Sequence, residues 1–197
     1  LFRNEDSLAL KNKNSWEVVF SDTLSNQIVF PNSPYLLSSI SKKIGLGNDF
    51  SKIKSQAKVF DDRNALNWVV SGRANAAVLP LSSCVDNLVE DPRLSIILPQ
   101  EGSPLNWTVL VSPMSSPELF PSDWFNLLWG PTYSIRMIRK GFFPPTSFPN
   151  WREKHIKTPK RYQSIFFPDA RFWNECWSLP VLSFEDQKNL ALIWNDS

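Results

Sequence analysis

Short apolar runs alternate with segments of helical spacing over residues 15–112. The apolar run 27–30 is rich in β-branched and aromatic residues and predicts a strand. A proline-containing turn then leads into a helix predicted over 34–44, which Gly45 ends because glycine tolerates a left-handed helix terminus. The pattern continues with a helix at Ser15, helices over 49–58, 63–71 and 82–90, and strands over 76–79, 96–99 and 107–112.

This alternation predicts an α/β fold with a mainly parallel sheet and helices on both of its faces. Ligands of such sheets bind beyond the carboxyl ends of the strands. Three loops follow predicted strand ends or lie beside a predicted strand, namely 31–35, 80–83 and 106–108. We therefore expect a ligand site where these loops meet.

The pattern changes after residue 112. Helices are predicted over 122–129 and 131–140, and an aromatic, proline-broken connector follows Gly141. The stretch 166–177 is aromatic and ambiguous. Residues 183–194 begin with Ser183 followed by acidic residues, which is a helix-capping pattern, and they predict a terminal amphipathic helix.

Composition indicates a folded chain with a real core. The chain has 197 residues, of which 42% are apolar and 20% charged. Nine Trp and fourteen Phe supply core area, and such rings also line pockets. No run approaches the roughly 20 apolar residues of a bilayer span, so direct membrane insertion is not expected.

Charge and cysteine usage narrow the choice of partners. The net charge is +2, and the main basic cluster, 154–161, is typical of a solvated loop rather than a nucleic-acid footprint. Cys84 and Cys176 lie far apart, so they either form one disulfide in an oxidising compartment or remain independent thiols. The first residues contain no export signal, and we expect Leu1 to be the edge of a mature fragment.

The sequence offers little material for catalysis. His155 is the only histidine and lies in the basic cluster without a Ser or Cys motif. The carboxylate pairs 61–62 and 185–186 fall at predicted helix starts, where they suit the helix dipole. No phosphate-cradling, dinucleotide or zinc-protease motif occurs. We therefore predict a binding protein, not an enzyme, with no cofactor and no metal.

The order of several motifs resembles the C-terminal portion of the spermidine/putrescine-binding proteins of ABC transporters, which have the type II periplasmic-binding fold. Ser15-Trp16 opens a helix before an apolar strand. The other motifs, in chain order, are SKKIG, NAAVLPLSS, LPQEGSPLNWTVLVSP, WGPTYSIRMIRKGFFPP and FFPDARFW. Together they cover nearly the whole chain.

The resemblance implies two lobes that close around a solute and are joined by crossing strands. Residues 1–14 would be the end of the first crossing strand and a linker, and 15–106 the inserted α/β lobe. Residues 107–197 would hold the second crossing strand, followed by helices that belong partly to the other lobe. The implied partners are a small-molecule solute, an ABC permease and an N-terminal lobe of the same protein that precedes Leu1. The implied location is the periplasm or cell envelope.

The family's ligand carboxylates are replaced in this chain. The resemblance puts Asn32 and Tyr35 where the family has two acids, and Asn106 and Thr108 near its Trp and Asp of the crossing strand. Each charge-assisted pair in a desolvated site contributes roughly 1.5 to 3 kcal/mol, so we expect spermidine and putrescine to bind weakly or not at all. A neutral or anionic solute is expected instead. The candidate ligand-binding residues are Asn32, Ser33, Tyr35, Ser82, Ser83, Asn106, Trp107, Thr108 and Phe142.

Two alternatives remain open. Asn32 and the serines are equally well explained as helix caps and turn residues. The domain as a whole would then be a ligand-free relative of the binding fold that acts as a protein-interaction or scaffold module. In either case, we expect apolar surface around Phe142, Phe143 and Trp151, either covered by a partner or exposed.

Overall fold

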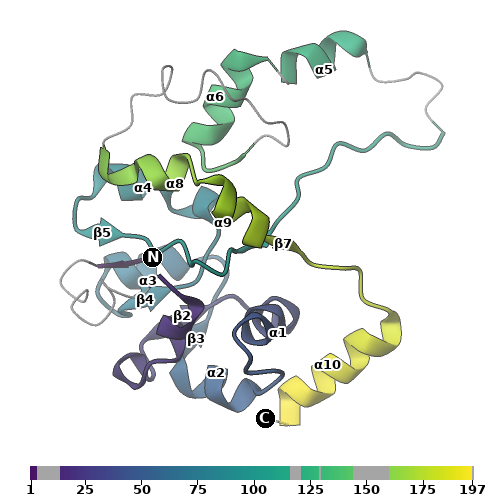
Figure 1. The fold of residues 1–197 in the computed structure, drawn as a ribbon. Coiled ribbons are helices and arrows are strands. Elements are labelled where there is room, and N and C mark those ends of the chain that lie inside the picture. The colour runs from purple at the N-terminus through teal and green to yellow at the C-terminus, as the bar shows by residue number, and fades with distance from the viewer. Residues whose placement is uncertain (4–13, 116–120, 129, 144–159, 197) are drawn as a thin grey trace. The chain divides into compact units, whose positions relative to one another are not determined.

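The structure is a computed structural model that describes residues 1–3, 14–115, 121–128, 130–143 and 160–196 (Figure 1). It divides into two compact units. The first comprises Leu1–Leu105 together with Ala170–Ser197, and the second comprises Asn106–Asp169. The predicted division at 14/15 and 106/107 stays a prediction.

The first unit is built on a five-stranded sheet. Its strands are β1 (Phe2–Arg3), β2 (Ile28–Phe30), β3 (Ala57–Phe60), β4 (Ala76–Ala77) and β5 (Leu94–Ser95), in the order β3-β2-β4-β1-β5. Strand β2 pairs in parallel with β3 and β4, whereas β1 runs antiparallel to β4 and β5. Four strands thus share one direction, and the prediction of an α/β fold with a mainly parallel sheet is confirmed.

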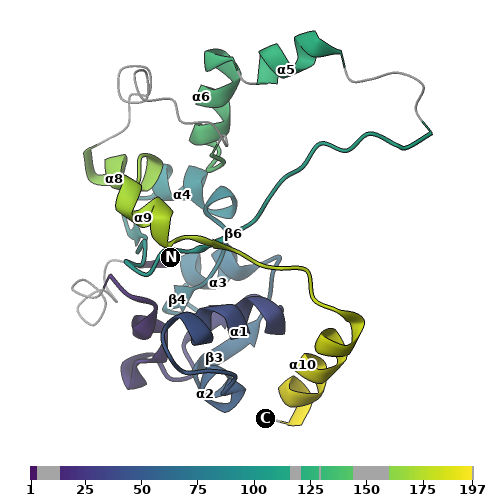
Figure 2. The same ribbon diagram turned by 45° about the vertical axis from the view of Figure 1, so that its right-hand side comes forward.

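The helices of the first unit begin largely at the predicted residues. They are α1 (Pro34–Lys43), α2 (Phe50–Gln56), α3 (Ala65–Val70), α4 (Val85–Glu90), α9 (Ala170–Glu175) and α10 (Phe184–Asp196), with 3-10 helices η2 (Trp16–Phe20), η3 (Asp22–Leu24) and η4 (Leu81–Ser83). Ser33 Oγ accepts a hydrogen bond from the backbone N–H of Leu36 (3.3 Å), and Ser183 Oγ accepts from that of Asp186 (3.1 Å). The predicted cap at Ser183 is therefore confirmed, and Ser33 caps α1, in agreement with the alternative interpretation of the serines. Figure 2 shows α10 at the end of an extended connection from β7.

The second unit is helical in its described part. It contains α5 (Ser122–Leu128), α6 (Pro131–Arg139), η5 (Lys160–Tyr162) and α8 (Gln163–Phe166). The helices predicted over 122–129 and 131–140 are confirmed, and Gly141 follows α6 with a positive φ of 77°. Among all the described helices, none is long and apolar enough to cross a membrane.

Two predicted strands are wrong, and one strand was missed. Residues 107–112 form no strand and are exposed, and the nearby β6 (Pro104–Leu105) instead pairs in parallel with β7 (Trp177–Ser178). The strand expected over 96–99 lies earlier, at β5, and β3 was not predicted. These errors share a cause, because an apolar run does not reveal which other strand is available to pair with it.

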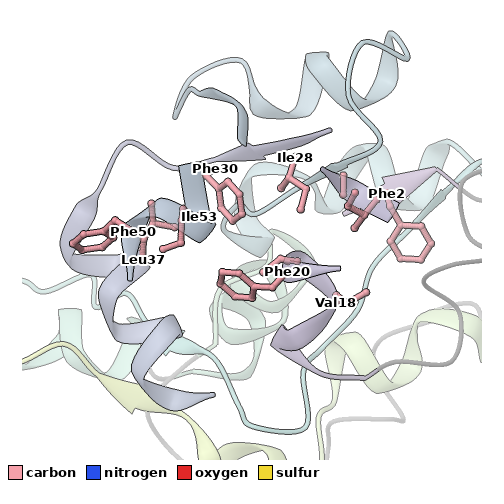
Figure 3. Close-up of a cluster of buried hydrophobic side chains, with 11 residues drawn as sticks. Phe2, Val18, Phe20, Ile28, Phe30, Leu37, Phe50 and Ile53 are labelled. Atoms are coloured by element: carbon pink, nitrogen blue, oxygen red, sulfur yellow. The ribbon is translucent and has the colours of Figure 1, made fainter. Parts of the chain in front are cut away.

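The core of the first unit lies between the sheet and the helices α1, α2 and η2. Phe30 of β2, Phe50 and Ile53 of α2 and Leu37 of α1 are almost wholly buried and belong to one cluster (Figure 3). Trp194 of α10 joins this core from outside. Its ring meets Phe50 and Phe60 edge-on, with ring centroids 4.9 and 5.1 Å apart. Leu190 of the same helix also packs against the core, so α10 is attached to it through Trp194 and Leu190.

Candidate functional site

The carboxyl ends of β3, β2 and β4 lie along one edge of the sheet, since these strands are neighbours and parallel. Asn32 and Ser33 follow β2, and Asp61-Asp62 follows β3. The backbone N–H of Asn32 donates to Asp62 Oδ1 at 3.1 Å, which joins the two strand ends. This edge is where the rule for parallel sheets locates a ligand.

A pocket of about 580 Å³ opens beside the strand end of β2. Residues 32–35 form one wall, while the connection between β7 and α10 and the first turns of α10 form the other. From this second wall, residues 179–182, Gln187, Leu190 and Ala191 line the space. All of these residues belong to the first unit. The volume is within the range of small-molecule sites.

Helix α1 is tied at its start to the second wall and at its end to α9 and β7, which precede that wall in the chain. At its start, the hydroxyl of Tyr35 donates a hydrogen bond to the carbonyl oxygen of Pro180. At its end, Lys43 Nζ lies 3.3 Å from Glu175 Oε2 and 5.4 Å from the centroid of the Trp177 ring. Tyr35 therefore joins the two walls directly, and Lys43 holds α1 against the segment that leads into the second wall.

The polar groups of the pocket differ in what they already bind. Ser33 Oγ serves as the helix cap, so its role as a cap is confirmed. Gln187 Nε2 donates to the carbonyl oxygen of Leu182 at 3.2 Å, which leaves Gln187 Oε1 as an acceptor. Within the described part of the chain, no hydrogen bond is made by the side-chain amide of Asn32. Asn32 and Gln187 are therefore able to bind a ligand from opposite walls.

The predicted loop after β4 is built differently from the expectation. Ser82 and Ser83 belong to η4 and do not cap the helix that follows. Helix α4 begins after Cys84, which makes no side-chain capping bond. The prediction of a serine-capped helix from residue 82 is thus wrong, because both serines lie inside the 3-10 helix η4. Neither serine lines the pocket.

The remaining predicted residues belong to the second unit. Asn106, Trp107, Thr108 and Phe142 are all exposed there, with 58% of Trp107 and 39% of Phe142 accessible. Their meeting with Asn32 at one site stays a prediction. Of the other predicted features, Trp151, His155 and most of the basic cluster lie outside the described residues.

The turn at Glu101-Gly102 positions the segment that leads into the pocket wall. The Glu101 carboxylate accepts hydrogen bonds from Ser15 Oγ (2.5 Å) and from the backbone N–H of Trp16 (3.2 Å). The indole N–H of Trp16 donates to the carbonyl oxygen of Gly102 at 2.8 Å. Gly102 has a φ of 78°, and a Cβ there would lie 2.3 Å from the carbonyl carbon of Glu175. Only glycine permits this close approach.

The pKa shifts of the described groups come mainly from local hydrogen bonds and from burial. Hydrogen bonds from the backbone N–H of Asn64 and from other donors lower the pKa of Asp61. Hydrogen bonds from Arg93 lower the pKa of Asp91 from 3.8 to about 2. Both cysteines are free thiols, and burial raises the pKa of each. Among the described residues, no group of three or more His, Cys, Asp or Glu side chains is arranged to hold a metal ion.

The sequence did not predict residues 179–182 and Gln187 as part of the site. They lie about 150 positions after Asn32, and they reach the pocket only because β7 pairs with β6 and α10 packs on the core. A Leu-Pro-Val-Leu run before a helix cap gives no signal of such contacts. No family model, curated protein or solved structure matches this chain.

Proposed function

We propose that the chain is the solute-capturing part of an ABC-type uptake system and forms a lobe of a type II periplasmic-binding fold. The observation that carries this proposal is the pocket between the end of β2 and the start of α10. It lies beyond the carboxyl end of a parallel strand, and its first wall contains Asn32 and Tyr35, which the resemblance puts at the family's ligand positions.

The sheet topology also supports a lobe of this kind. Strand β1 is the single strand that runs against the others, between β4 and β5. A strand that enters the lobe from outside its βα repeat need not share the direction of that repeat. This fits the resemblance, in which Phe2-Arg3 ends a strand that crosses from a preceding lobe. That lobe and a membrane permease would be the partners, in the periplasm or cell envelope.

The pocket chemistry favours a solute other than a polyamine. A buried ammonium group needs a carboxylate or the face of an aromatic ring. Among the described lining residues, no side chain is acidic, and Tyr35 is the only aromatic one. Spermidine and putrescine are therefore expected to bind weakly, and a neutral or anionic solute is the better candidate.

A ligand panel tests solute capture. Thermal unfolding of the full-length protein would be followed with amines, amino acids, sugars and anions. A true ligand at a hundredfold excess over its Kd stabilises the folded state by about 2.7 kcal/mol. Asn32→Ala should reduce that shift, whereas Asn67→Ala, an exposed asparagine on α3, should leave it unchanged. A panel in which no compound shifts the transition would contradict solute capture.

A second function, a protein-interaction or scaffold domain, is favoured by one observation. The extended segment after β6 exposes several large apolar side chains, namely Trp107, Val109, Leu110, Val111 and Met114. Patches of this kind mark interaction surfaces. A chain that binds no compound of the panel, and yet binds a partner protein only when Leu110 and Val111 are intact, would favour this function over solute capture.

A further inference from the structure

The lining of the pocket beside α1 specifies the ligand more closely than the choice between a polyamine and other solutes. Of the described residues that line it, none has a charged side chain, and most are aliphatic or proline. Desolvating an ion without an opposite charge is costly. The lining therefore disfavours both cations and anions. Only charged groups near the pocket could offset this.

The start of α1 is a poor anion site, although helix starts often bind anions. Pro34 has no N–H, and the N–H of Leu36 is taken by Ser33 Oγ. The N–H of Leu37 is bound to the carbonyl oxygen of Ser33 at 3.0 Å. Of the first-turn donors, only that of Tyr35 remains for a ligand.

The charges around the pocket also oppose a simple ionic ligand. Asp62 accepts from the backbone N–H of Asn32, so a carboxylate stands beside the first wall and repels an anion. This carboxylate is exposed and does not line the pocket, so a bound cation would not be paired with it. Lys43, at the far end of α1, is engaged by Glu175 and Trp177.

The uncommitted hydrogen-bonding groups include both donors and acceptors. The Asn32 amide offers an N–H pair and an oxygen, and Gln187 offers Oε1 from the opposite wall. Ser33 accepts from Leu36, so its hydroxyl proton is left to donate. A carboxylate only accepts and an ammonium group only donates, but an amide does both. The aliphatic lining would cover the apolar body of the same ligand.

We propose that the pocket takes an uncharged, amide-bearing molecule of about dipeptide size with apolar side groups, and that Asn32 and Gln187 bind its amide. This inference rests on the proposed solute capture and specifies its ligand class. The size follows from the volume of about 580 Å³. The ligand amide bridges Asn32 and Gln187, and its side groups lie against the residues of the second wall.

Three matched compounds test the inference by titration calorimetry on the full-length protein at pH 7. They are acetyl-dileucine amide, which is neutral, dileucine amide, which is a cation, and acetyl-dileucine, which is an anion. The neutral compound should bind at least about tenfold more tightly than either ion. Gln187→Ala should weaken it roughly 2- to 10-fold, since one hydrogen bond is lost. The exposed Gln163→Ala, on α8, is the matched control and should have no effect.

A charge variant gives a positive test. Gln187→Glu puts one carboxylate into the pocket wall and should raise the affinity for the cation above that for the neutral compound. Tighter binding of the anion or the cation by the unmodified protein would overturn the inference. Failure of all three compounds to bind would also overturn it. The wider ligand panel is a separate measurement, so solute capture is judged independently of this ligand class.

Discussion

Replacing Gly102 by alanine tests the packing that positions the pocket wall. Gly102 has a φ of 78°, and an added methyl group would lie 2.3 Å from the carbonyl carbon of Glu175 and 2.5 Å from the backbone nitrogen of Cys176. These are backbone atoms next to β7, which is paired with β6. They cannot turn away as a flexible side chain could, so the methyl group must separate the two segments.

Two terms set the expected loss of stability. A left-handed conformation costs a residue with a Cβ about 1 to 2 kcal/mol. Overpacking of a tight contact typically costs about 1 to 3 kcal/mol more. We therefore expect Gly102→Ala to lower the free energy of unfolding by about 2 to 5 kcal/mol. In a chain of this length, that corresponds to a fall in Tm of roughly 4 to 20 °C.

Urea unfolding of two alanine variants separates the two terms. Gly45 has a φ of 79°, almost the same as Gly102, but nothing lies within 4 Å of its added Cβ. Gly45→Ala therefore carries the conformational cost alone and should lose only about 1 to 2 kcal/mol. Equal losses in the two variants would refute the close approach between Gly102 and the segment before β7.

Three further changes test other contacts. Glu101→Ala removes the acceptor of two hydrogen bonds at the start of η2 and should lower the free energy of unfolding in urea by about 1 to 3 kcal/mol. Glu90→Ala, at an exposed position, should change this free energy by less than about 0.5 kcal/mol. Equal losses in the two variants would count against the contact made by Glu101. Trp194→Ala should lower the free energy of unfolding by about 1 to 3 kcal/mol and speed amide hydrogen exchange throughout α10. Trp124→Ala changes a side chain on α5 that is 56% exposed, and it should leave hydrogen exchange in α10 unchanged. Unaltered exchange in both variants would show that other contacts hold α10. The pKa of Asp91 in the folded state, about 2, lies below its ordinary 3.8, so the stability it contributes is present above about pH 4 and is lost as the pH falls toward 2. Asp91→Asn should therefore flatten the stability curve in that window, and an unchanged slope would contradict the assigned hydrogen bonds.

Local chemistry made much of the fold predictable. Pro34 at the first helical position and Ser183 before acidic residues correctly located the starts of α1 and α10, because these signals act within one helical turn. Gly45 correctly located the end of α1 for the same reason. The alternation of apolar runs and helical segments sufficed for the α/β class, since it reflects the period of each element.

Long-range pairing was not predictable in the same way. The run 107–112 has strand composition but no partner strand in the described structure, while the short β6 pairs with a segment more than 70 residues later. The second wall of the pocket was missed because the contact between Tyr35 and Pro180 spans 145 positions. Contacts of this kind depend on the assembled fold, and the residues next to them in the sequence do not indicate them.

The reversed strand β1 has a consequence for how the protein is made. Phe2 pairs with Ala76 on one side and with Ser95 on the other, so β1 joins β5 to the rest of the sheet. On the ribosome, Phe2 emerges before either neighbour, since Ala76 follows it by 74 positions and Ser95 by 93. Strands β2, β3 and β4 can associate during that interval. Strand β5 can therefore join the sheet only through β1, and slowing elongation just after Ser95 should favour its correct pairing over aggregation of the nascent chain.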